Sequence, residues 1–142
     1  MASAIVVDTM IASAWLGTRD SARKTRWRPL LSRSPWVLPF TVVAEMRFGA
    51  EVAGRGCPTT RRLGATRRIV QSDAAAGRGT DAYVDLRTWC VRDGHGLSAK
   101  DHEADRWVAA VALAAELPLA SEDSIFGDIP QLRRADPGGS SL

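Results

Sequence analysis

The sequence predicts an α/β fold in which helices cover both faces of a short parallel sheet. Three short apolar runs have the length of buried strands: Ala4–Val7, Trp36–Leu38 and Leu117–Ala120. Helical segments separate these runs, and strands that alternate with helices usually pair in parallel with the helices packed outside. The 142 residues are 45% hydrophobic and 25% charged, which is the composition of one globular domain.

The first half of the chain supplies two strands and three helices. Ile11–Leu16 follows the first strand as a short helical turn, and Ser21–Leu31 is predicted to form a basic amphipathic helix. After the strand at Trp36–Leu38, the hydroxyl of Thr41 is a suitable N-cap for a helix. That helix should continue to about Ala53, because two glycines follow closely.

The second half supplies further helices and the last strand. Thr59–Ile69 is predicted to be helical, and a third strand is expected around Val70. Thr80–Asp93 has the pattern of a helix that Gly94 closes. Glu103–Glu116 is rich in alanine and apolar, so we expect this helix to pack centrally.

Domain organisation and location follow from composition. We expect one domain over residues 1–134 and a flexible tail over 135–142, where proline, glycine and serine are frequent. The apolar stretch Val108–Ala115 is too short to span a bilayer, and no cationic region precedes the first apolar run. A cytoplasmic protein without membrane contact is therefore expected.

Positive charge is concentrated in two segments. The formal net charge is +3, and arginines crowd residues 19–33 and 55–78. Basic segments beside an acidic site would suit a polyanionic substrate. A solvated basic helix face explains the same pattern equally well.

Four carboxylates occur where the pattern predicts functional positions. Asp8 directly follows the first strand, and Asp123 follows the last, so both should lie at the carboxyl edge of the sheet. Glu45 and Asp105 fall on or beside the apolar stripes of their helices. Taken singly, each acid has a simpler explanation: a turn for Asp8, an arginine partner for Glu45, the helix dipole for Asp105.

The joint arrangement favours a metal-dependent enzyme. Clustered carboxylates raise one another's pKa and destabilise the fold unless a cation neutralises them. Two cysteines and two histidines offer no zinc-type ligand spacing, so the cation should be one that prefers oxygen, Mg²⁺ or Mn²⁺. Such an ion activates water and stabilises charge on a phosphoryl oxygen, which predicts phosphodiester hydrolysis.

The acids lie in the segments Ile5–Thr9, Thr41–Gly49, Ala104–Ala110 and Leu117–Asp123. These segments, and with them nearly the whole chain from about Ala4 to Arg134, resemble the PIN-domain ribonucleases. They are most similar to the VapC toxins of bacterial toxin–antitoxin modules. The resemblance implies a PIN-like α/β/α sandwich and an endoribonuclease toxin that cuts structured RNA, such as tRNA or rRNA. It also implies a homodimer and neutralisation by a VapB-type antitoxin.

The resemblance also assigns roles to residues. Asp8, Glu45, Asp105 and Asp123 match the acidic catalytic quartet, with Asp8 and Asp105 as the main ligands of Mg²⁺ or Mn²⁺. Thr9 and Ser121 match hydroxyl positions that orient the carboxylates. Met10 stands where the family often carries Asn, and Ile125 where many members carry a further acid. His102 is assigned to the helix start or the surface. The arginines expected to bind RNA are Arg61, Arg62, Arg67 and Arg68.

Two other functions stay open. One is a PIN-fold nuclease of RNA processing outside any toxin module, against which the absence of an added RNA-binding domain counts. The other is an RNA-binding protein without catalysis, against which the four intact acids count.

Overall fold

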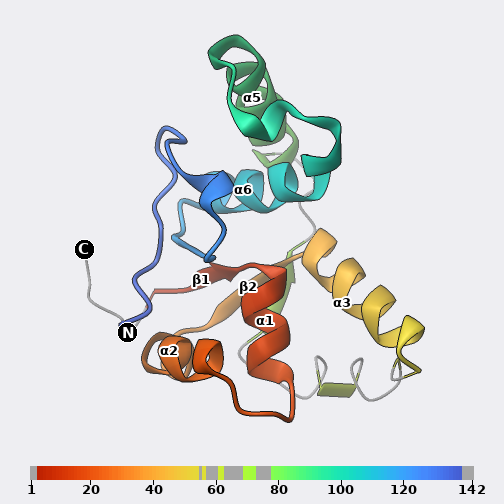
Figure 1. Cartoon of the computed structure of the whole chain (residues 1–142). Helices are drawn as coiled ribbons and strands as arrows, with labels where there is room; N and C mark the ends of the chain where they lie inside the picture. The colour runs from red at the N-terminus through yellow and green to blue at the C-terminus, as the bar shows by residue number, and fades with distance from the viewer. Residues whose placement is uncertain (1–2, 55, 57–60, 63–68, 73–77, 139–142) are drawn as a thin grey trace.

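The computed structural model contains a four-stranded parallel sheet (Figure 1). It describes residues 3–54, 56, 61–62, 69–72 and 78–138. The strands are β1 (Ile5–Val7), β2 (Trp36–Pro39), β3 (Ile69–Ser72) and β4 (Leu119–Ala120), in the order β3-β2-β1-β4. The predicted parallel sheet is thus confirmed, and β1 lies inside it with a neighbour on each side.

The helices form the outer layers of a sandwich, as predicted. Figure 1 shows α6 (Glu103–Ala115) on one side of the sheet and α1 (Thr9–Leu16) and α2 (Ala22–Leu31) on the other. Next to α6 packs α5 (Arg78–Asp93), while α3 (Phe40–Val52) contacts both β2 and α6. No helix in the described part of the chain is long and apolar enough to cross a membrane.

The core lies between the sheet and these helices. Val6, Val7 and Leu38 of the strands are fully buried. The alanine-rich helix α6 buries its residues from Val108 to Ala112, which confirms its central position. Small side chains there allow the helix to approach the sheet closely.

Two predicted boundaries are wrong. The helix α3 begins at Phe40 with Pro39 as its N-cap residue, and Thr41 makes no capping bond. Pro39, with its φ of −55°, ends β2 and leads directly into the helix, so the hydroxyl of Thr41 is buried without a partner among the described residues. The strand β4 starts two residues later than expected, because the amide of Leu117 still donates to Ala112 of α6.

The other predicted boundaries agree closely. Ser21 caps α2, its hydroxyl accepting a 3.1 Å hydrogen bond from the amide of Lys24. After α5, Gly94 adopts a left-handed φ of +71°. The predicted helix over Thr59–Ile69 lies mostly outside the described residues, and Ile69 itself belongs to β3. The predicted tail, 135–142, also lies partly outside them.

Candidate active site

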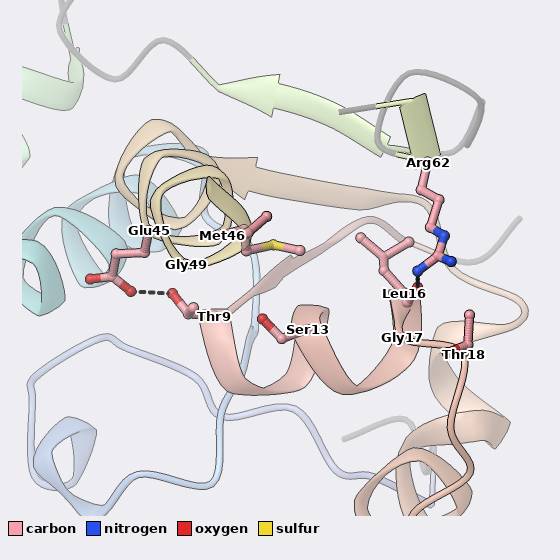
Figure 2. Close-up of a pocket in the computed structure, with 10 residues that line it drawn as sticks. Thr9, Ser13, Leu16, Gly17, Thr18, Glu45, Met46, Gly49 and Arg62 are labelled. Carbon is pink, nitrogen blue, oxygen red and sulfur yellow. Dashed lines mark hydrogen bonds between the residues drawn. The ribbon is translucent and has the colours of Figure 1, made fainter. Parts of the chain in front are cut away.

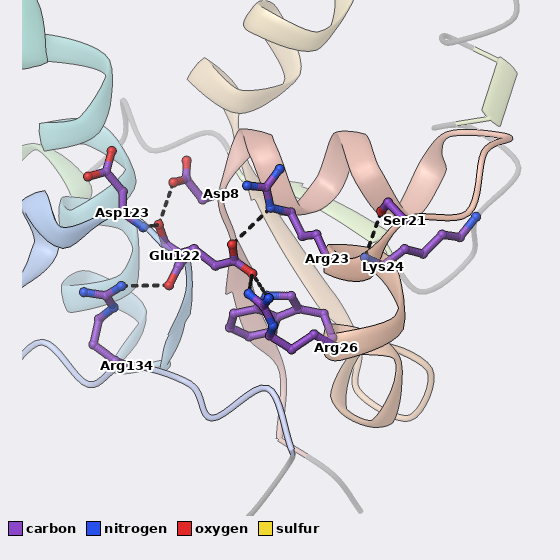
Figure 3. Close-up of polar contacts among 10 residues, drawn as sticks. Asp8, Ser21, Arg23, Lys24, Arg26, Glu122, Asp123 and Arg134 are labelled. Atoms are coloured by element: carbon purple, nitrogen blue, oxygen red, sulfur yellow. Dashed lines mark hydrogen bonds and ion pairs between the residues drawn. The ribbon is translucent and has the colours of Figure 1, made fainter.

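The carboxyl ends of β1 and β4 meet at one edge of the sheet, and they join Asp8 to Ser121. The parallel register pairs Val7 with Ala120, and the amide of Asp8 donates to the carbonyl of Ala120 at 3.0 Å. The hydroxyl of Ser121 donates to Asp8 Oδ2 at 2.8 Å and accepts from the amide of Asp123 at 3.1 Å (Figure 3). Asp8 and Asp123, which were predicted from the strand ends, are therefore connected through the hydroxyl of Ser121, which the family resemblance singled out.

Asp8 is a buried carboxyl group, and burial disfavours its charged form. Its side chain caps α1 by accepting from the amide of Thr9 at 2.8 Å, and the residue is only 8% exposed. Burial raises the pKa of Asp8; the bonds from Ser121 and Thr9 lower it, and the charges of Asp105 and Glu45 raise it further. The net pKa lies above the ordinary value for aspartate. The structure thus brings three of the four predicted acids within electrostatic reach of one another.

Glu45 reaches this site from α3. The hydroxyl of Thr9 donates to Glu45 Oε2 at 2.6 Å, which ties the start of α1 to α3 (Figure 2). The expectation that Glu45 is buried is wrong, because its side chain is exposed. The buried face of α3 is formed by Val42, Val43, Met46 and Ala50. Glu45 instead lies beside that face, where the helix borders open space at the edge of the sheet.

Asp105 is hydrogen-bonded to His102, which the sequence analysis assigned to the helix start or the surface. The Nδ1 atom of His102 lies 2.8 Å from Asp105 Oδ2, and the two side chains are 31% and 28% exposed. The hydrogen bond to Asp105 raises the pKa of His102, burial opposes it slightly, and the charges of Asp101, Asp105 and Asp123 add to the rise. His102 does begin the helix, as expected, but it also contacts a site carboxylate.

Asp123 stands at the margin of this group. Its Oδ1 accepts from the amide of Ile125 at 3.0 Å and so caps the short helix η3 (Ser124–Phe126). Its charge acts on His102, while its backbone is linked to Asp8 through Ser121. Asp8, Glu45 and Asp105 therefore form the inner part of the site, and Asp123 borders it.

The donors of this site suit a hard cation. Among the described residues, no three acidic, histidine or cysteine side chains lie close enough together to form a metal-ligand set. The raised pKa of the buried Asp8, caused by burial and by two neighbouring carboxylates, is nevertheless the electrostatic situation that a bound cation relieves. Carboxylate oxygens at Asp8 and Asp105 could hold Mg²⁺ or Mn²⁺, with water supplying the other ligands.

A second polar cluster anchors the segment that carries Ser121 and Asp123 (Figure 3). Glu122 accepts hydrogen bonds from three side chains of α2: Arg23 at 3.1 Å, Arg26 at 2.7 Å and Trp27 at 2.9 Å. Partial burial would raise the pKa of Glu122, but the bonds from Trp27 and Arg23 and the two arginine charges outweigh it. The pKa is therefore lowered.

An arginine near the end of the chain holds the same segment from the other side. Arg134 pairs with Leu119 as an isolated bridge, and its Nη2 donates to the carbonyl of Ser121 at 2.7 Å. The residues on either side of Glu122 are thus fixed by α2 on one flank and by Arg134 on the other. The sequence analysis predicted neither the contacts of Glu122 with α2 nor the contact of Arg134 with Ser121. The partners of Glu122 lie nearly a hundred residues away in the sequence.

We expect Glu122→Gln to destabilise the protein by about 1 kcal/mol at neutral pH, the upper value for partly exposed ion pairs. The pKa of Glu122 is lower in the folded state than its ordinary value of 4.5. The carboxylate therefore stabilises the fold at pH values above 4.5. This contribution is lost as the pH falls through the lowered pKa. Melting temperatures of variant and wild type should therefore differ at about pH 7 and converge as the pH falls below the lowered pKa of Glu122.

Asp20→Asn provides the control for Glu122→Gln. It removes a contact of 4.0 Å between the exposed side chains of Asp20 and Arg28, and it should leave the melting temperature unchanged. A pH-independent difference for Glu122→Gln would contradict the charge-based explanation.

Arg106, next to Asp105, is the other residue that sequence reasoning missed. Its side chain is 2% exposed. One nitrogen, Nη1, donates to the carbonyls of Leu97 at 2.6 Å and Ala99 at 2.7 Å, and Nε donates to the hydroxyl of Tyr83 at 3.3 Å. These bonds fix the turn that leads into α6, and with it the start of the helix that carries His102 and Asp105.

Of the four arginines expected to bind RNA, the structure describes Arg61 and Arg62. Arg61 is exposed, and Arg62 donates from Nη1 to the carbonyl of Leu16 at 3.2 Å. Arg67 and Arg68 lie outside the described residues.

Comparison with known proteins places this geometry in context. The PIN domain family model matches residues 5–132. A DNA-bound VapBC structure from Salmonella typhimurium is similar with a TM-score of 0.74 and 18% identity, over 96% of this chain and 99% of that one. VapBC2 from Rickettsia felis, bound to a DNA fragment from its promoter, is similar with a TM-score of 0.72 and 19% identity, over 92% of this chain and 96% of that one. VapC20 from Mycobacterium tuberculosis, a sarcin–ricin loop cleaving toxin, is similar with a TM-score of 0.62 and 17% identity, over 91% of this chain and 98% of that one. No curated protein matches the chain.

Proposed function

The chain belongs to the PIN-domain family, and on that premise we propose that it is an endoribonuclease toxin that requires Mg²⁺ or Mn²⁺. Its substrate is structured RNA, tRNA or rRNA, and a VapB-type antitoxin neutralises it. The observation that carries the proposal is the buried Asp8, whose pKa is raised by burial and by the charges of Asp105 and Glu45. Acidic residues whose pKa is raised in this way by burial and by neighbouring carboxylates are expected at a functional site.

In this proposal each residue of the site has a role set by its position. Asp8 and Asp105 would hold the metal ion, which when bound would supply an activated water and stabilise charge on the phosphoryl oxygen. Thr9 donates to one oxygen of Glu45, and the other oxygen, which has no partner among the described residues, would accept the proton of the attacking water. Ser121 keeps Asp8 oriented, and Asp123 would hold water at the margin of the site.

The toxin role and the partners rest on the structural neighbours. Two of them are VapBC complexes, and one is a toxin that cleaves a loop of RNA. These similarities support an antitoxin of the VapB type as the partner of this chain. A homodimer and a cytoplasmic place of action are further parts of the same proposal. We also expect a small open reading frame immediately upstream of the gene.

Cleavage of total bacterial RNA by the purified protein, freed of any antitoxin, tests the activity. We expect discrete fragments with Mg²⁺ and none with EDTA, because the carboxylates alone cannot activate water. Asp85→Asn, which changes an exposed acid on α5, should cleave like the wild type. RNA binding without fragments in Mg²⁺ would favour a non-catalytic RNA-binding protein. Cleavage by a protein without a neighbouring antitoxin gene would favour RNA processing.

A further inference from the structure

A cavity of about 330 Å³ lies between α1 and α3 and opens beside the candidate active site (Figure 2). One end is formed by the hydrogen-bonded pair Thr9 and Glu45, and the other end is formed by Arg62. Figure 2 shows these ends on opposite sides of Met46. The cavity therefore runs from the proposed site of hydrolysis to a positive charge.

The lining of this cavity combines an apolar floor with hydroxyl groups. Met46 and Ala50 are buried in α3, and Leu16 of α1 is half-buried. Ser13 and Thr18 add exposed hydroxyls along the α1 wall. An apolar surface that includes a thioether suits the face of an aromatic ring, and hydroxyls can donate to or accept from the edge of a base.

The charge at the far end is held in place by the backbone. The guanidinium of Arg62 donates from Nη1 to the carbonyl of Leu16 at 3.2 Å, which fixes it at the end of α1. A guanidinium carries five N–H donors and a permanent charge, so Arg62 can bind a phosphate in addition to its partners within the protein.

We propose that this cavity binds one nucleotide of single-stranded RNA, the one adjacent to the bond that is cut. The base packs on Met46 and Leu16, the hydroxyls contact its edge or the ribose, and Arg62 binds the phosphate on its far side. Only the placement of the cut bond beside Glu45 rests on the proposed function. A cavity of this size falls at the lower end of ligand pockets, which fits one nucleotide.

Gly49→Leu tests this inference by filling the cavity from α3. Gly49 lines the cavity, and a Cβ added there meets no atom within 4 Å among the described residues. Leucine is also a better helix former than glycine, so the variant should fold at least as well as the wild type. Ala44→Leu is the matched control, because it adds the same side chain at an exposed position of α3 outside the cavity lining.

The probe is a set of fluorescein-labelled RNA hexamers, U6, A6 and C6, titrated in EDTA and followed by anisotropy. We expect Gly49→Leu to weaken binding about tenfold, the loss of the contacts of one base, while Ala44→Leu binds like the wild type. Ser13→Leu fills the same cavity from α1 and should show the same loss. This second variant decides the test if Gly49→Leu fails to fold.

Binding in EDTA separates this inference from the proposed activity. Hexamer affinity unchanged in the two filling variants overturns the nucleotide site, even if the protein cleaves RNA in Mg²⁺, and leaves the cavity to a peptide. No hexamer binding by the wild type overturns it as well. A selective loss in the filling variants supports the site, even if no cleavage occurs and the nuclease proposal fails.

Discussion

Asp8→Asn is expected to reduce RNA cleavage by about a thousandfold, because removing one charge from the metal ligands costs several kcal/mol of transition-state stabilisation. Asparagine keeps an oxygen that can accept from the amide of Thr9, and it has nearly the shape of aspartate. The fold should therefore remain intact. Initial rates on a defined RNA, in Mg²⁺, measure the loss, with Asp85→Asn as the control.

The same substitution should stabilise the protein at neutral pH. The pKa of Asp8 is raised above its ordinary value of 3.8, so the folded chain binds the proton more tightly than the unfolded chain does. Ionisation of Asp8 thus costs stability, and the cost appears as the pH rises from the ordinary to the raised pKa. Asparagine removes that cost, so the variant should melt higher than the wild type at about pH 7 and alike at about pH 3.

Added Mg²⁺ provides a further measurement that does not depend on cleavage. A cation that binds the folded state raises the melting temperature of the wild type, and Asp8→Asn should lose most of that increase. Cleavage at the wild-type rate by Asp8→Asn, or an equal effect of Mg²⁺ on both proteins, would contradict the assignment of Asp8 as a metal ligand.

Arg106→Ala is expected to lower the free energy of unfolding by about 3–5 kcal/mol. The substitution leaves the carbonyl of Leu97 buried without its donor, at about 1–3 kcal/mol, removes the partly buried bond to Ala99, and opens a cavity beside Tyr83. Chemical denaturation followed by circular dichroism measures the effect.

The matched control for Arg106 is Arg133→Ala. Arg133 also donates to a backbone carbonyl, that of Glu116 at 2.7 Å, but its side chain is exposed. Water replaces the lost donor there, so the loss should stay below about 1 kcal/mol. Equal losses in the two variants would show that burial does not determine the importance of Arg106.

The sheet and the acids at its edge could be predicted from the sequence because the signals are local. A short apolar run followed by a polar residue marks the end of a buried strand, and ends of parallel strands share an edge. Asp8 and Asp123 were found in this way, and hydrogen bonds through Ser121, which the family resemblance singled out, now connect them. Neither prediction required knowledge of a distant partner.

The orientation of α3 could not be predicted in the same way. At helical spacing Gly49 and Ala53 continue the apolar stripe that Val42 and Met46 begin, but both are exposed, and Val43 and Ala50 are buried instead. Glycine and alanine have little side chain to bury, so they give weak evidence about which face of a helix points inward. Pro39, the N-cap residue, also places the start of the helix at Phe40, ahead of the predicted cap at Thr41.

The residues that support the site escaped prediction for a different reason. Glu122 and Arg106 contact side chains or carbonyls that only the folded chain brings near them. Charged residues at such positions look like ordinary surface residues in the sequence. His102 was assigned to the start of a helix, and only the structure showed its bond to Asp105.

The bond between Ser121 and Asp8 has a consequence for the order of events during protein synthesis. The two residues are separated by 113 positions, and the central strand β1 acquires its second neighbour only when β4 pairs with it. A nascent chain can therefore form β1 and the helices that follow it while the ribosome still holds the segment around Ser121. The bonds of Ser121 to Asp8 and Asp123 cannot form until that segment emerges, so we expect the candidate site to be completed only near the end of synthesis.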